Sequence, residues 1–132
     1  VCSSDLVAFG YFGFACAATA KETKGYRLPA CFVIHTVGPV WFGGKQNEEA
    51  KLAQSYANSL LLAQKHNLHS IAFPCISTGV YRFPAKAAAR IALESLKQTL
   101  PQCPSVEKII FCCFSKTDAE YYRALLAAEQ AV

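Results

Sequence analysis

The 132-residue sequence has no apolar run long enough to cross a bilayer, and it carries little charge. Its most continuous apolar stretch, residues 7–20, is shorter than the roughly 20 residues that a membrane helix needs, and Gly10 and Gly13 interrupt it. Charged residues make up only 17% of the chain and hydrophobic residues 53%, a composition typical of a compact domain and not of a disordered one. We therefore expect one domain with a core of ordinary size and no membrane partner.

Clustered basic residues are also absent. The net charge is +4, and the lysines and arginines form no stripe along the sequence. Such a charge favours anionic ligands slightly, but it lacks the pattern that nucleic-acid-binding proteins show. We predict no specific nucleic-acid binding.

The seven cysteines include no CxxC pair, and the three histidines show no metal-ligand spacing with them. Most of the cysteines lie inside apolar runs. We interpret them as reduced, buried thiols of a cytoplasmic protein, and we expect neither a bound metal nor a cofactor.

Apolar runs alternate with helical patterns along the chain. Buried strands are predicted at residues 31–37, 70–76 and 106–114, with a short further strand at 19–23. Helices are predicted from Asn47, the N-cap, to about Lys65, from Pro84 to about Leu100, and over 119–129 after a Thr117–Asp118 cap. The expected inward faces of the three helices are Leu52, Tyr56, Leu60 and Ala63; Ala88, Ile91, Ala92, Leu96 and Leu100; and Tyr122, Leu125 and Leu126. This order predicts an α/β fold with mostly parallel strands and helices on both faces.

The strand at 70–76 is followed by a small polar loop, Ser77, Thr78, Gly79, Val80 and Tyr81. A loop between a strand and a helix start places backbone N–H groups and the positive end of the helix dipole together, which suits a phosphate. The lysine of a P-loop and the glycines of GxGxxG are both absent, so backbone amides would do most of the binding. An ordinary turn without a ligand is the alternative.

Two other segments are expected beside this loop. Because ligands of parallel sheets bind beyond the carboxyl ends of the strands, residues 38–41, 77–81 and 114–116 are expected along one edge. Tyr81 and Phe83 would either form the wall of a ribose site or pack the loop. No GxSxG motif surrounds Ser77, and Cys75 lies in an apolar run, so we interpret neither as a nucleophile.

Three segments carry a family resemblance: GYRLPACFVIHTVGPVW at 25–41, GGKQNE at 43–48, and SIAFPCISTGVYRFPAKAAARIAL at 70–93. Together they resemble the macro domain, and most closely the MacroD-like group that includes bacterial O-acetyl-ADP-ribose deacetylases. The resemblance implies a three-layer α/β/α fold with a mixed, largely parallel sheet and a cleft for ADP-ribose at the carboxyl ends of the strands. It assigns the diphosphate and distal ribose to Ser77, Thr78, Gly79, Val80 and Tyr81, and it places Phe83 close to that ribose.

The same resemblance implies an activity. Members of the group hydrolyse O-acetyl-ADP-ribose or remove mono-ADP-ribose from proteins, without a metal. The expected partners are therefore ADP-ribose, O-acetyl-ADP-ribose and mono-ADP-ribosylated proteins. A non-catalytic module that only binds ADP-ribose is the alternative, and a remnant that binds no ligand is a third reading.

The resemblance covers residues 20–132, so we expect an incomplete macro domain that lacks its N-terminal strands. Residues 1–19 match poorly, and residues 1–6 resemble the translation of a sequencing adapter, so we leave them out of the fold. The Asn-Ala-Ala-Asn-type segment and the glycine-rich loop with its aspartate are not found here, so no catalytic residue carries over. Arg82 stands where the group commonly has glycine. We expect the 132-residue chain to bind ADP-ribose weakly or not at all.

Overall fold

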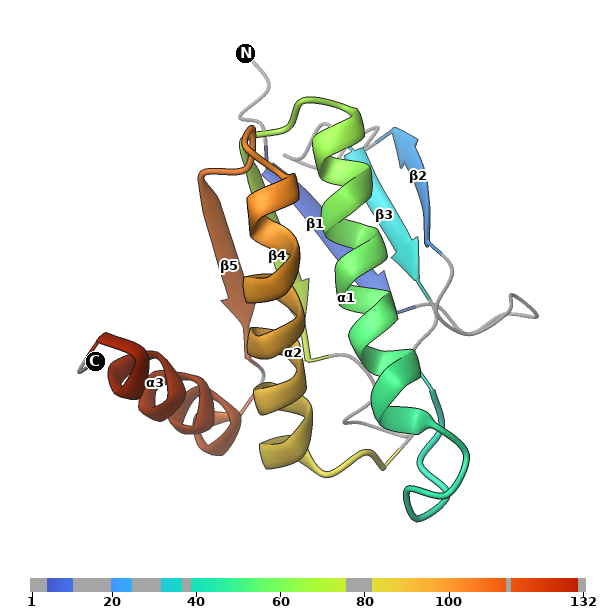
Figure 1. The fold of residues 1–132 in the computed structure, drawn as a ribbon, viewed down its shortest axis with the longest axis vertical. Helices are drawn as coiled ribbons and strands as arrows, with labels where there is room; N and C mark the ends of the chain where they lie inside the picture. Colours follow the sequence, from blue (N-terminus) through green and yellow to red (C-terminus); the bar gives the residue numbers. More distant parts are fainter. Residues whose placement is uncertain are drawn as a thin grey trace.

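The computed structural model describes residues 5–10, 20–24, 32–36, 39–75, 82–113 and 115–130. Within these residues three strands come first, and from the third strand onward strands and helices alternate, as Figure 1 shows. The elements are β1 (Asp5–Gly10), β2 (Ala20–Lys24), β3 (Phe32–Thr36), α1 (Glu48–Lys65), β4 (Ser70–Pro74), α2 (Ala85–Thr99), the 3₁₀ turn η1 (Leu100–Gln102), β5 (Lys108–Cys112) and α3 (Lys116–Gln130).

The five strands form one sheet in the order β2-β3-β1-β4-β5. Strand β1 pairs in parallel with β3 and β4, and β4 pairs in parallel with β5. Only β2 runs antiparallel, along β3. The prediction of a mixed, largely parallel sheet is confirmed. The strands predicted at 31–37, 70–76 and 106–114 are present with shorter bounds, and the strand predicted at 19–23 is present one residue later, at 20–24.

Strand β1 differs from our expectation for the N-terminal segment. We left residues 1–6 out of the fold, but Asp5 and Leu6 belong to β1 and lie opposite Ser70 and Ile71 of β4. The physical reason is in the sequence: LVAF is an apolar run, as expected of a strand with parallel neighbours on both sides. Excluding these residues from the sheet was therefore wrong, whereas the proposed origin of residues 1–6 stays a prediction.

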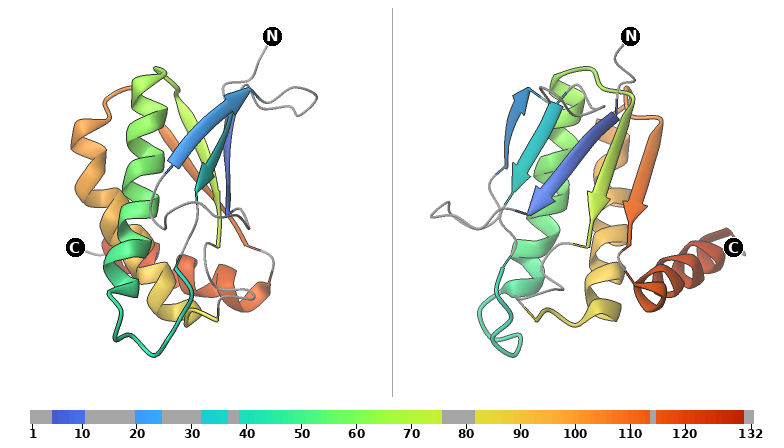
Figure 2. Two further views of the ribbon diagram at one scale, coloured as in Figure 1. Left: turned by 90° about the vertical axis from the view of Figure 1, so that its right-hand side faces the viewer. Right: turned by 180° about the vertical axis from the view of Figure 1, so that it is seen from behind.

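Helices α1 and α2 lie side by side on one face of the sheet, as the edge-on view in Figure 2 shows. Helix α3 lies beyond the carboxyl end of β5 and contacts α2. The second helical layer of the expected three-layer fold is not among the described residues. Of the described helices, none has the length and hydropathy needed to span a membrane.

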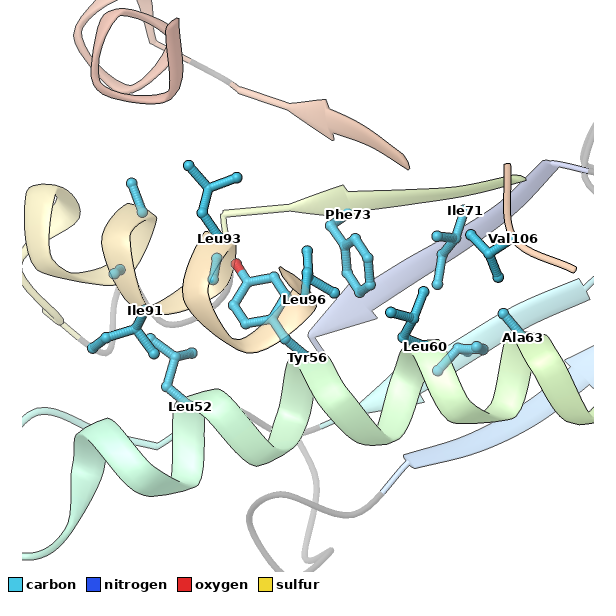
Figure 3. Close-up of a cluster of buried hydrophobic side chains, with 14 of the residues drawn as sticks. Leu52, Tyr56, Leu60, Ala63, Ile71, Phe73, Ile91, Leu93, Leu96 and Val106 are labelled. Atoms are coloured by element: carbon cyan, nitrogen blue, oxygen red, sulfur yellow. The ribbon is translucent and has the colours of Figure 1, made fainter. Parts of the chain in front are cut away.

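The core lies between α1, α2 and the sheet (Figure 3). The predicted inward face of α1 is confirmed, since all four of its residues are fully buried: Leu52, Tyr56, Leu60 and Ala63. They meet Ile71 and Phe73 from β4, which alternate with residues of the opposite sheet face. This contact fixes helix α1 over the strand that leads to the candidate site.

Two residues expected to face inward are exposed instead. Leu100 belongs to η1 and not to α2, so the turn there changes from 3.6 residues to about three and rotates the side chain outward. Leu126 is exposed because α3 reaches the core mainly through Tyr122 and, in part, through Tyr121 and Leu125.

The start of α3 also differs from the prediction. The helix begins at Lys116, three residues before the predicted Ala119. The hydroxyl of Ser115 accepts a hydrogen bond from the Asp118 N–H at 3.1 Å, so Ser115 is the capping residue and not Thr117 or Asp118.

Neighbouring leucines on α1 test this core. Leu60→Ala removes a fully buried side chain and should lower the free energy of unfolding by about 2–5 kcal/mol. Leu61→Ala, at a position 39% exposed, should change it by about 0.5 kcal/mol or less. Urea denaturation of both variants measures the difference, and equal losses would contradict the assignment of the α1 inward face.

Candidate functional site

The candidate site is the edge of the sheet where β3, β4 and β5 end, which we call the rim. Figure 1 shows the arrowheads of these three strands and of β1 pointing the same way. The segments predicted to line the rim follow Thr36, Pro74 and Cys112 in the sequence. The parallel pairing thus gives these segments a common edge to start from, as expected for a ligand site in such a sheet.

Most residues predicted to bind a ligand lie outside the described residues. These are Ser77, Thr78, Gly79, Val80 and Tyr81. Their assignment stays a prediction, as does the interpretation of Ser77. Phe83 is the one predicted ligand-binding residue that the structure describes.

Phe83 connects two segments of the rim. Its side chain is only 2% exposed, and its ring lies 4.8 Å from that of Trp41, centroid to centroid, with the planes tilted by 59°. This is a favourable aromatic geometry. Phe83 therefore packs its segment against the chain that follows β3; its contact with a ribose stays a prediction.

The segment around Trp41 makes a tight turn before α1. Gly43 and Gly44 have φ angles of +86° and +87°, a left-handed backbone that disfavours other residues. A Cβ atom at Gly44 would also lie 3.2 Å from Cη2 of Trp41, closer than most real contacts. The glycine pair therefore lets the backbone fold closely over the indole.

Glu48 holds this turn together. Its carboxylate accepts hydrogen bonds from the backbone N–H groups of Phe42 at 3.4 Å, Gly44 at 2.6 Å and Gln46 at 2.5 Å. Burial of the carboxylate acts to raise its pKa, but these N–H groups outweigh that effect and keep the pKa below its ordinary value. Glu48 is thus an ionised, buried centre around which residues 42–46 are ordered.

The sequence did not reveal this role. It predicted Asn47 as the N-cap of α1, and Asn47 does occupy that position with φ 57°, but no side-chain capping hydrogen bond forms. From the sequence, Glu48 was only one of two acidic residues in the first turn of α1, where the helix dipole favours a negative charge. The available signal was the glycine pair just upstream, because it indicates a turn, and the N–H groups of a turn need an acceptor.

Arg82 has an unusual backbone conformation. Its φ is +60°, in the left-handed region, and its side chain is exposed. A residue with a Cβ atom is strained there, whereas glycine is not. This explains why glycine suits the position, and it places an exposed cation between Tyr81 and Phe83 in the sequence.

The end of β4 is anchored from α1. The hydroxyl of Tyr56 donates to the carbonyl oxygen of Pro74 at 3.4 Å, and the Tyr56 and Phe73 rings lie 5.1 Å apart. Phe111 of β5 stacks on Tyr122 of α3 with 4.4 Å between ring centroids. The last residues of both strands are therefore fixed by aromatic packing before the chain enters the rim.

Cys75 follows directly and is half-buried. Burial, and after it the neighbouring Cys113, raises the pKa of the Cys75 thiol to about 12. So little thiolate at neutral pH agrees with our interpretation that Cys75 is not a catalytic nucleophile. Within the described part of the chain, no three His, Cys, Asp or Glu side chains are grouped so that they could hold a metal ion.

Comparison with known proteins adds a family. The profile described as "Macro domain" matches residues 14–92. A macro domain-containing protein of Chlorobaculum tepidum is 55% identical over 109 residues, which are 83% of this chain and 63% of that protein. A Klebsiella pneumoniae protein named O-acetyl-ADP-ribose deacetylase is 50% identical over 101 residues, 76% of this chain and 58% of its own length. The chain thus spans about three fifths of these relatives.

Solved structures agree on the fold. A mutant Oceanobacillus iheyensis macrodomain with ADPR superposes with a TM-score of 0.87 at 27% identity, covering 98% of this chain and 88% of that one. The Trypanosoma brucei macrodomain in complex with ADP-ribose gives 0.80 at 29% identity, covering 93% and 63%. The macro-domain fold inferred from the sequence is confirmed.

Acid stability tests the role of Glu48. Because its pKa is lower in the folded state than its ordinary value of 4.5, the carboxylate stabilises the fold above that pH and stops doing so as pH falls through the folded value. Glu48→Gln should therefore destabilise the protein at pH 7, and the gap to the wild type should shrink below pH 4.5. Glu49→Gln, an exposed neighbour, is the control and should show little effect in the same urea titrations.

Two arginines test the backbone strain at Arg82. At this left-handed position, Arg82→Gly should be more stable than Arg82→Ala by about 1 kcal/mol. At Arg90, inside α2, the order should reverse, with Ala more stable than Gly by about 0.5–1 kcal/mol. Thermal unfolding of the four variants measures both differences; the same order at both positions would refute the left-handed conformation.

Proposed function

The chain belongs to the macro domain family, and on this premise we propose that it binds ADP-ribose at the rim. The Oceanobacillus iheyensis macrodomain with ADPR and the Trypanosoma brucei macrodomain in complex with ADP-ribose both superpose closely on this chain. The Klebsiella pneumoniae relative is named for an ADP-ribose derivative, O-acetyl-ADP-ribose. The ligand of these relatives is the natural first candidate here.

The observation that carries the proposal is the packing of Phe83 against Trp41 at the rim. We assign Ser77–Tyr81 to the diphosphate and distal ribose. The aromatic contact holds the residues that directly follow this loop. Helix α2 begins at Ala85 with no acidic residue in its first turn, so the positive end of its dipole is not neutralised by its own side chains. A diphosphate between that helix start and the N–H groups of the loop would be well placed.

For the protein to which this chain belongs, we propose a hydrolase. Its substrates would be O-acetyl-ADP-ribose or proteins carrying mono-ADP-ribose, and water would attack the ester at the distal ribose. Holding the diphosphate fixes the ribose relative to that water, and backbone N–H groups stabilise the charge that develops. We assign no catalytic residue.

A non-catalytic ADP-ribose reader is the second candidate, and Glu48 is the observation that favours it. Glu48 is a buried carboxylate near the rim, but both of its oxygens accept backbone N–H groups. A carboxylate engaged in this way with a lowered pKa is a poor general base. Glu48 therefore has a structural role, and a protein that only binds ADP-ribose would not need it as a general base.

Calorimetric titration of ADP-ribose into the 132-residue chain tests the binding proposal. We expect a dissociation constant on the order of 10⁻⁴ M, weak because a wall of the expected cleft has no matching residues. Gly79→Val should weaken binding about tenfold or more, since a side chain there keeps the backbone away from the ligand. Glu107→Ala, at the opposite end of the strands, should bind as the wild type does.

Absence of heat at millimolar ADP-ribose, from protein with a cooperative thermal transition, would refute the proposal. Equal affinity of Gly79→Val and the wild type would refute the assigned site. Incubation with O-acetyl-ADP-ribose then separates the two candidates: acetate release above the uncatalysed rate supports the hydrolase, and binding without release supports the reader.

A further inference from the structure

Two cysteines that directly follow neighbouring strands lie close together at the rim. Strands β4 and β5 run parallel with Pro74 opposite Cys112, so Cys75 and Cys113 are the next pair in the same register. Neighbouring strands lie about 4.7–4.9 Å apart, within the Cα separations that a disulfide spans. The backbone therefore holds these two residues at bridging distance.

Their side chains point the same way. Phe73 and Phe111, two residues earlier on each strand, face the core with their rings stacked at 6.4 Å. By the period of two, Cys75 and Cys113 lie on that face, and both pack partly buried against the core. The Cys75 thiol donates to the carbonyl oxygen of Cys112 at 4.0 Å, and Cys113 is near enough to raise the pKa of that thiol. All three cysteines here, Cys112 included, are reduced.

We propose that Cys75 and Cys113 form a thiol pair that a hydroperoxide converts to a disulfide. One thiol attacks the peroxide oxygen, becomes a sulfenic acid and releases one molecule of water or alcohol. The second thiol displaces the hydroxyl group, which leaves as water together with the last thiol proton. Two thiols are oxidised by two electrons, and one peroxide is reduced.

The surroundings determine how this pair reacts. Burial against the core raises the pKa of the Cys75 thiol, and the neighbouring Cys113, Asp118 and Cys112 raise it further, so its thiolate is scarce at neutral pH. Oxidation is therefore slow and needs an excess of peroxide. Cys112 faces away from the pair and is exposed, so it competes for oxidant without belonging to the pair.

The bond would also affect the candidate site, a consequence that rests on the proposed function. Cys75 immediately precedes the segment that leads to Ser77–Tyr81. Bringing the two sulfur atoms to the ~2.05 Å of a disulfide pulls the end of β4 toward β5. We expect ADP-ribose to bind at least about threefold more weakly to the oxidised protein, because the loop start is displaced.

The test uses Cys112→Ser, which leaves Cys113 as the one cysteine in its tryptic peptide. Folded protein is treated with hydrogen peroxide, free thiols are alkylated, and trypsin releases peptides 66–82 and 109–116. We expect these two peptides joined and lighter by two hydrogen atoms, and a Tm raised by about 5–10 °C that dithiothreitol reverses. Adding Cys75→Ser or Cys113→Ser to this background should abolish both signals.

A folded Cys112→Ser protein that yields no joined peptide, or whose Cys75 pairs with another cysteine, would overturn the proposal. Calorimetric titration of ADP-ribose into the reduced and the oxidised protein measures the effect of the disulfide on affinity separately. Equal affinities would overturn that consequence. If neither form binds ADP-ribose while the joined peptide is found, the proposed function fails and the thiol pair stands.

Discussion

The packing of Tyr56 against Phe73 is the contact on which the rest of the structure depends. It places α1 over the middle of the sheet, and the tyrosine hydroxyl then reaches the carbonyl of Pro74, the last residue of β4. A single side chain therefore joins the core to the point where the chain leaves the sheet for the candidate site. On the β5 side, the stack of Phe111 on Tyr122 does the same for the start of α3.

Two further contacts extend this order from the core to the rim. Glu48 gathers the N–H groups of the turn before α1, and the Trp41 ring above that turn supports Phe83, which begins the approach to α2. The acid and the aromatic pair have structural roles in the described residues, whereas the proposed contacts with ligand come from backbone N–H groups. With this division of roles, the ligand loop can consist of small residues, whereas the side chains that support it are bulky.

Much of the fold could be predicted from the sequence, because strands β3, β4 and β5 are continuous apolar runs and α1 keeps a regular spacing of inward residues. The errors fall where local pattern does not decide. Leu100 follows the helical spacing but lies in a 3₁₀ turn, and Leu126 does so on a helix with little contact to the core. Glu48 was missed because its partners depend on the left-handed glycines that turn the chain around it. The place of the ligand loop between a strand and a helix start favoured a phosphate site, but its assignment to the diphosphate and distal ribose came from the resemblance.

The central claim is that ADP-ribose binds at the rim through the backbone of Ser77–Tyr81. Amide chemical shifts of ¹⁵N-labelled protein, followed while ADP-ribose is added, test it most directly. The account predicts the largest changes at residues 77–81, smaller ones at Phe83 and the first turn of α2, and none at β2, on the edge of the sheet away from β4. Saturable changes centred elsewhere, with residues 77–81 unaffected, would contradict it.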